Sequence, residues 1–351
     1  MDAKIITLKN YINNNPEFKK KVDIIETTKK TDMENNGSFG WDKNWLLQKP
    51  DEEQAVLRSI FGKELVIPQG DVGLFVAAGG TGKTQLLMQL VTALATNTKW
   101  LNLFVRGETK GKICYVFGEE HKQRIQRRFQ KIFQNLNLTQ EQLYTFDKNI
   151  RLFPMHKIDA TFSKGDNSFQ NKLTQILMKH AGEDGWDLII LDPASRFLPK
   201  DAEIDNAAAT DFIRECEKFS ELPGNPSILI SHHVNKSSMK GATLFSQEAD
   251  SNQSASRGAS GLVDGARFVI NVDNIFKEDW LKTTQFANKR LLKIIHSKIN
   301  CGPFMQAVHG VIDSNGIIYS LSESEEEELK ICRAIGNTNA IGKNLKNMNY
   351  I

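Results

Sequence analysis

Short, uninterrupted apolar runs recur along the chain from about residue 67 onward, and turn residues bound each of them. Runs of this kind are typical of strands that are buried on both faces, as in a parallel sheet covered by helices. Segments with helical spacing separate the runs. We therefore expect strands at 72–78, 113–118, 187–192, 227–231, 266–272 and 291–297, and helices at 83–95, 120–135, 168–181 and 206–221. This alternation predicts an α/β fold with a mostly parallel central sheet flanked by helices.

The two ends of the chain differ from this middle part. The first 65 residues are polar, rich in Lys and Asn, and only weakly periodic. Residues 305–321 predict a C-terminal β-hairpin that turns at Asn315-Gly316. The acidic run at 323–328 is typical of a solvated segment. We thus expect an N-terminal extension at 1–65, one core at 66–322, and an acidic and then polar tail at 323–351.

Composition changes this picture little. With 351 residues, 40% apolar and 25% charged, the chain has the make-up of an ordinary globular protein. Its four cysteines lie far apart without a C-x-x-C pair, which argues against a zinc site and a disulfide scaffold. No apolar run could span a membrane and no signal peptide is evident, so we expect a cytoplasmic protein without a membrane partner. A net charge of +3 neither demands nor excludes nucleic acid.

The stretch from Ala77 to Thr84 carries the strongest chemical signal. It follows an expected strand, precedes an expected helix, and reads Ala-Ala-Gly-Gly-Thr-Gly-Lys-Thr, the order of a phosphate-binding P-loop with Ala77 in place of its first glycine. Glycines let backbone N–H groups surround a phosphate chain at the positive end of a helix. Lys83 would reach the β- and γ-phosphates of ATP, and the Thr84 hydroxyl would hold Mg²⁺. The expected nucleotide-binding residues are Gly79, Gly80, Thr81, Gly82, Lys83, Thr84 and Gln85.

Two further strands end in carboxylates. The run Leu188-Ile189-Ile190-Leu191 ends at Asp192, which would bind Mg²⁺ through water or, alternatively, cap the next turn. The expected strand at 113–118 ends before Glu119 and Glu120, one of which could polarise the attacking water. We favour Glu119 because it lies at the strand tip. Glu120 falls in the first turn of a helix, where the dipole stabilises an acid.

Polar residues follow the expected strand 227–231. His232, in the pair His232-His233, could sense the γ-phosphate and relay its loss, or could be purely structural. The long polar loop 235–256 places Lys236 and Lys240 where they could contact phosphates of single-stranded nucleic acid, the alternative being a mobile loop with incidental lysines. Arg257 lies between flexible residues ahead of a strand, a position suited to reaching a phosphate in cis or across a subunit interface.

Together these segments resemble the RecA-like P-loop ATPases, in particular the hexameric replicative helicases of the plasmid RepA type. The resemblance spans roughly residues 66–320, in the family's order, through Leu74 to Leu90, Gly111 to Arg128, Trp186 to Phe197, Ser227 to Lys236, Gln253 to Val272 and His296 to Phe304. It implies a RecA-like core and a homo-oligomer, in most such proteins a hexameric ring.

The resemblance also implies roles for single residues. Glu119 corresponds to the catalytic glutamate, His232 and His233 to the histidine pair, and Arg128 to an arginine that stacks on adenine. Arg257 resembles the finger that enters the next subunit's site. The segment Ser297 to Pro303 resembles the Lys-x-Arg finger strand of DnaB-type helicases, but it has Asn300 where they have arginine, which moves the expectation to Arg257.

These observations predict an ATPase that acts on single-stranded DNA as a ring-forming helicase or translocase, in replication of a plasmid, phage or other mobile element. ATP and Mg²⁺ are the expected cofactors. Two alternatives stay open: a RecA/RadA- or KaiC-like ATPase that serves recombination or regulation without unwinding, and a nucleotide-gated assembly module with slow hydrolysis.

Overall fold

The computed structural model describes residues 47–62, 64–163, 165, 167–200, 202, 205–234, 260–275 and 289–331. The chain divides into two compact units, Met1–Glu52 and Glu53–Ile351. Of the first unit only residues 47–52 are described, and all of them are exposed. In the described part of the chain, no helix combines the length and apolar character needed to cross a membrane.

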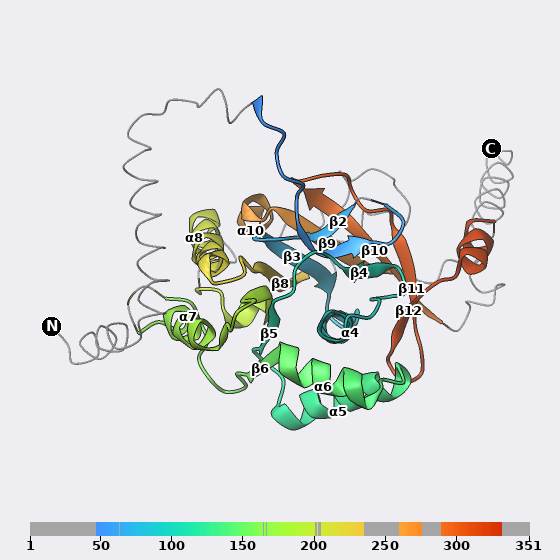
Figure 1. Ribbon diagram of the computed structural model, residues 1–351, viewed down its shortest axis with the longest axis horizontal. Coiled ribbons are helices and arrows are strands. Elements are labelled where there is room, and N and C mark those ends of the chain that lie inside the picture. Colours follow the sequence, from blue (N-terminus) through green and yellow to red (C-terminus); the bar gives the residue numbers. More distant parts are fainter. Residues whose placement is uncertain are drawn as a thin grey trace, which may run out of the picture. The chain divides into compact units, whose positions relative to one another are not determined.

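A nine-stranded sheet forms the centre of the second unit, in the order β12-β11-β10-β9-β3-β8-β7-β5-β6 (Figure 1). Its strands from β9 to β6 pair in parallel, whereas β10, β11 and β12 continue the sheet in antiparallel fashion. The strands are β3 (Val72–Ala78), β5 (Lys112–Phe117), β6 (Ile150–Pro154), β7 (Trp186–Asp192), β8 (Ser227–Val234), β9 (Phe268–Ile275), β10 (Arg290–Ile299), β11 (Val308–Ile312) and β12 (Ile318–Ser320). The predicted fold class, an α/β core with a mostly parallel central sheet flanked by helices and a C-terminal β-hairpin, is confirmed.

Helices cover both faces of this sheet (Figure 1). One hydrophobic core holds side chains of α4 (Lys83–Thr96), α5 (Lys122–Asn135) and α6 (Gln140–Asn149). The other holds side chains of α7 (Phe169–His180), α8 (Asn206–Glu217) and α10 (Ser260–Gly265). Two short 3-10 turns, η1 (Ala194–Arg196) and η2 (Lys218–Glu221), follow β7 and α8. The result is a three-layer arrangement with α4 against the sheet.

Burial on both faces explains why the parallel strands are apolar throughout. In β7, Leu188 and Ile190 enter the first core, while Ile189 and Leu191 enter the second. Close packing also fixes one glycine, because a Cβ on Gly73 of β3 would overlap the ring of Phe268 on the neighbouring strand β9. Steric fit of this kind selects glycine where two strands must approach closely.

Several elements are absent from the sequence-based expectations. A small antiparallel sheet, β2-β1-β4, uses β1 (Ala55–Ser59), β2 (Leu65–Pro68) and β4 (Phe104–Arg106). The second compact unit therefore begins before the boundary expected at residue 66, and β1 belongs to it. The helix α6 was also missed, because Phe146 is its single buried residue and the apolar periodicity is weak. Its capping box, Thr139 with Gln142, is the signal that could have found it.

The C-terminal hairpin forms as expected around the turn before Gly316, whose φ is 81°. The outer strand β12 of the hairpin is bonded to α4 at Ile318. The side chain of Gln89 accepts the N–H of Ile318 and donates to its carbonyl. Beyond the hairpin, the expected acidic tail begins as a helix over residues 323–331, with a capping box between Ser322 and Glu325. Leu329 is buried and Glu326 pairs with His309 of β11, at 2.8 Å.

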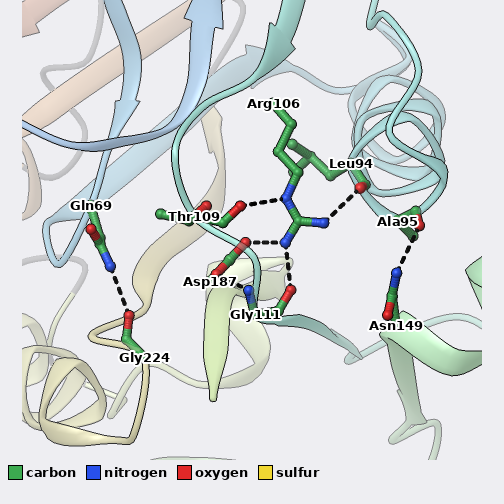
Figure 2. A network of polar contacts seen from close by, with 9 residues as sticks. All are labelled: Gln69, Leu94, Ala95, Arg106, Thr109, Gly111, Asn149, Asp187 and Gly224. Atoms are coloured by element: carbon green, nitrogen blue, oxygen red, sulfur yellow. Dashed lines mark hydrogen bonds and ion pairs between the residues drawn. The ribbon is translucent and has the colours of Figure 1, made fainter. Parts of the chain in front are cut away.

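A buried ion pair joins α4 to the beginnings of two central strands (Figure 2). The guanidinium of Arg106 contacts the carboxylate of Asp187 and donates to the carbonyls of Leu94, Thr109 and Gly111. Asp187 in turn accepts the N–H of Gly111, at 2.6 Å. Because both charges are buried and nearly every polar atom has a partner, removing either residue would leave an uncompensated charge. The network holds the last turn of α4 against β5 and β7.

His296 links β10 to the small sheet. Its Nε2–H donates to the carbonyl of Val66, at 3.0 Å, and its Nδ1 accepts the N–H of Met305, at 3.3 Å. Both contacts require the neutral imidazole with its proton on Nε2. Burial accordingly lowers the pKa of His296 to about 4.

This depressed pKa predicts a loss of stability in acid. In the unfolded chain, His296 binds a proton as the pH falls below the ordinary histidine pKa near 6.5. In the folded chain it binds that proton only near pH 4. The free energy of unfolding should therefore fall by about 2 kcal/mol between about pH 7.5 and about pH 5 on account of this group. Urea denaturation of the wild type and of His296→Gln at both pH values measures the difference. The exposed His180→Gln is the control, and an unchanged pH dependence in His296→Gln would contradict the assignment.

Candidate functional site

The P-loop lies at the carboxyl end of β3, where it turns into α4. Gly80 and Gly82 adopt positive φ values of 78° and 104°, which side-chain-bearing residues rarely adopt. Ala77 is an ordinary strand residue paired with β8 and β9, so its substitution for glycine causes no strain. A Cβ on Gly79 or Gly80 would meet nothing within 4 Å, so the tip of the loop is open.

Lys83 is buried beneath this loop as the first residue of α4. Its ammonium donates to the carbonyls of Ala77, at 2.7 Å, and Ala78, at 3.3 Å, and it lies 2.8 Å from Nδ1 of His233. Burial lowers the pKa of Lys83 to about 8, although the charge of Asp192 acts in the opposite direction. The ammonium thus lies at the loop with three neutral acceptors and no direct carboxylate contact.

Asp192 is buried at the end of β7. Its Oδ2 accepts the hydroxyl of Tyr115 on the adjacent strand β5, at 2.7 Å, and its backbone carbonyl accepts the N–H of Gly118. Burial, and then the neighbouring Asp192, raise the pKa of Tyr115 well above its usual value, so the hydroxyl remains a donor. Tyr115 therefore fixes the orientation of the Asp192 carboxylate. Sequence pattern alone offered no sign of this partner, because it depends on which strands are neighbours.

The two glutamates after β5 have different surroundings. Glu119 is half-exposed and its Oε1 lies 3.1 Å from Nε of Arg196 on η1. Glu120 is largely covered and pairs with Arg124, at 3.3 Å, and Arg128, at 2.8 Å, both from α5. Glu119 is thus the carboxylate that is open to solvent at the strand tip, whereas Glu120 is engaged with α5. The Glu120 contact also gives Arg128 a protein partner in addition to the expected adenine.

The histidine pair is placed differently from expectation. His233, not His232, lies against Lys83, because alternate residues of a strand face opposite sides of the sheet. His232 follows Ile228 and Ile230 toward the second core and is buried. Burial first, and then His233 and Lys83, lower the pKa of His232 to about 4, and burial and Lys83 also lower that of His233. Nδ1 of neutral His233 accepts a hydrogen bond from the Lys83 ammonium, which leaves the imidazole proton on Nε2.

Strand β9 and the antiparallel strands β10 to β12 supply contacts that the sequence reading missed. Asn274 of β9 donates to the Thr81 hydroxyl, at 3.1 Å, and Arg290 of β10 donates to the carbonyl of Gly80, at 2.7 Å. The apolar ends of Ile312 and Ile318 lie beside Gly82, at the distance of van der Waals contact for a Cβ built there. The C-terminal strands therefore form a second wall around the P-loop.

The structure brings together Lys83, Asp192 and Glu119 at one edge of the sheet, with Thr84 beside them at the start of α4 and Gln85 one residue further on. Lys298, in the segment compared with a finger strand, donates instead to the carbonyls of Val263 and Asp264. Three expected site residues lie outside the described residues: Lys236, Lys240 and Arg257.

Oxygen donors suited to magnesium are present at this edge. The Thr84 hydroxyl and the Asp192 carboxylate, of which one oxygen is held by Tyr115, form the hard donor set that Mg²⁺ prefers. Within the described part of the chain, no group of three or more His, Cys, Asp and Glu side chains could hold a metal ion. The two residues fit an ion that takes its remaining ligands from water and phosphate oxygens, as Mg²⁺ commonly does.

Comparisons with known proteins identify one matching family and distantly similar solved structures. A family model described as an AAA domain, AAA_25, matches residues 42–239. No curated protein is significantly similar to the chain in sequence. Among solved structures, the ATPase domain of G40P is 15% identical, with a TM-score of 0.48 over 72% of this chain and 86% of that one. The KaiC-like protein PH0186 from Pyrococcus horikoshii OT3 is also 15% identical, with a TM-score of 0.41 over 73% and 91% of the two chains. At this distance neither neighbour bears on function.

Removal of the Lys83 side chain should weaken nucleotide binding. Lys83→Ala deletes the cation at the loop, and loss of a charged hydrogen bond of this kind corresponds to an affinity loss of about 10- to 100-fold. Titration with a fluorescent ATP analogue measures the dissociation constant. The exposed Lys99→Ala is the matched control, since it removes the same charge near the other end of α4. Equal affinity in Lys83→Ala and the control would rule out Lys83 as a phosphate ligand.

Proposed function

Because the chain belongs to the AAA_25 family of AAA domains, we propose that it is an ATP-hydrolysing motor that acts on single-stranded DNA as a ring-forming helicase or translocase. The P-loop, the RecA-like sheet order and the family match make it a P-loop ATPase domain. The observation that supports hydrolysis is the meeting of Lys83, Asp192 and Glu119 at one sheet edge. A nucleotide cradle with a half-exposed carboxylate beside it has the components of phosphoryl transfer to water.

In this proposal each residue of the site has its own role in ATP hydrolysis. The loop N–H groups hold the phosphate chain, and Lys83 turns from the carbonyls of Ala77 and Ala78 to the β- and γ-phosphates. Thr84 and Asp192 would hold Mg²⁺, which neutralises developing charge on the phosphates when bound. Glu119 orients the attacking water and accepts its proton. Arg128 stacks on the adenine.

Coupling to DNA rests on the segment that follows β8. His233 contacts Lys83 and lies one residue before the end of β8, after which the chain continues to Lys236 and Lys240. We assign sensing of phosphate loss to His233 in place of His232, because His233 is the one that reaches the P-loop lysine. Lys236 and Lys240 would bind the DNA backbone, and Arg257 would enter the site of the next subunit in a ring of hexameric size. Hydrolysis would then move a DNA-binding loop.

Substitutions can distinguish the roles of Glu119 and Glu120 in hydrolysis. Glu119→Gln should keep nucleotide affinity and slow hydrolysis by about 10²- to 10⁴-fold, because the amide cannot accept the proton. Glu120→Gln is the matched comparison and should retain hydrolysis, since its carboxylate is engaged by Arg124 and Arg128. Phosphate release and analogue binding are measured for both variants. Normal hydrolysis in Glu119→Gln, with loss in Glu120→Gln, would transfer the role to Glu120.

The function itself is tested by ATP hydrolysis with and without single-stranded DNA, alongside sedimentation of the same sample. We expect several-fold stimulation by DNA, decreasing as salt rises because phosphate contacts release counterions, and a ring-sized particle. Lys236→Ala with Lys240→Ala should weaken the stimulation. The paired control is Lys172→Ala with Lys179→Ala, two exposed lysines of α7. Hydrolysis that is indifferent to DNA in a monomer or dimer would instead indicate a regulatory or assembly ATPase.

A further inference from the structure

Arg290 opens strand β10 and lies against the P-loop, although the resemblance to known families assigns it no role. One terminal nitrogen of its guanidinium donates to the carbonyl of Gly80, at 2.7 Å. Gly80 lies at the open tip of the loop, two residues before Gly82, the N-cap of α4. A cation is therefore held at the nucleotide cradle by a single neutral acceptor.

Among the residues that the structure describes, no acidic side chain pairs with Arg290. Two other arginines around the site do have carboxylate partners: Arg196 has Glu119 and Arg128 has Glu120. Across the residues that the structure describes, Arg290 makes no ion pair, and its side chain is exposed. A guanidinium carries five N–H donors, so most of its hydrogen-bonding capacity remains for a ligand.

The pairing of β9 with β3 and β10 places the backbone of Arg290 beside the P-loop. Strand β9 runs beside β3 with Val272 opposite Ala77, and it continues past that point to Asn274, which holds the Thr81 hydroxyl. Strand β10 returns antiparallel, with Leu291 opposite Ile275, so Arg290 starts level with the end of β9. Both strands thus reach the P-loop from the same subunit, and the ladder of β9 and β10 positions Arg290 there.

We propose that Arg290 binds the terminal phosphate of the nucleoside triphosphate held by the P-loop of its own subunit. This inference rests on the proposed nucleotide function and adds a cation in cis to Lys83 and to the neighbouring subunit's finger. The loop N–H groups cradle the inner phosphates, which leaves the terminal phosphate as the group that needs further cations. Its oxygens carry charge and match the guanidinium fork, so they displace the weaker neutral contact to Gly80.

The test compares a non-hydrolysable ATP analogue with ADP. In Arg290→Ala, the dissociation constant for the triphosphate should rise about 10- to 100-fold, as expected for a lost charged hydrogen bond, while that for ADP changes much less. Arg290→Lys should lie between the two, since it keeps the charge and loses the fork. Arg214→Ala is the control, because this exposed arginine of α8 pairs, among the described residues, with Asp211 of its own helix.

The other outcomes are distinguishable. An equal loss for both nucleotides would mean that Arg290 only shapes the loop, and unchanged affinities would mean that it makes no contact; either result overturns the inference while the proposed function stands. A wild-type protein that binds neither nucleotide would overturn the proposed function and this inference with it. Mixing Arg290→Ala with Lys83→Ala subunits tests the cis assignment: no recovery of triphosphate binding is expected, and recovery would show that Arg290 acts across subunits.

Discussion

Parallel pairing of β3 with β8 and β9 is the constraint on which the rest of the structure depends. Side-by-side strands that run in one direction end at the same edge of a sheet, and ligands of open α/β sheets bind outside that edge. The pairing of Ala77 with His233 and Val272 sets the register, so that the P-loop, the histidine pair and the end of β9 lie level. Asp192 and Glu119 reach the same edge through β7 and β5.

The buried ammonium of Lys83 places a positive charge at this edge of the sheet. Transfer of a cation out of water is unfavourable, and burial accordingly lowers the pKa of Lys83 to about 8. Two carbonyls and a neutral histidine offset part of that cost without supplying a negative charge. A phosphate chain would supply it. Burial, and then the charge of Lys83, lower the pKa of His233, whose protonation would place two cations within 2.8 Å of each other.

Strand β9 and the antiparallel strands beyond it contribute residues to the site. Gln89 ties α4 to β12, Asn274 holds the Thr81 hydroxyl, and Arg290 lies on the carbonyl of Gly80. At the opposite end of α4, the buried pair of Arg106 and Asp187 fastens the last turn to β5 and β7 (Figure 2). The P-loop helix is consequently held at both ends by residues from distant parts of the chain, and this leaves the loop tip as its open part.

The sequence by itself determined the P-loop, the buried strands and the hairpin at Asn315-Gly316. Strands covered on both faces must be apolar throughout, and Gly80 and Gly82 occupy conformations that other residues avoid. Both features can therefore be recognised from the residues of a short segment. Weakly apolar elements such as α6 and β1 left no such pattern. Only the tertiary structure decided which histidine meets Lys83, that Tyr115 orients Asp192, and that Asn274 and Arg290 reach the loop. Those contacts depend on strand order and register, which join residues far apart in the chain and leave no local periodicity to detect.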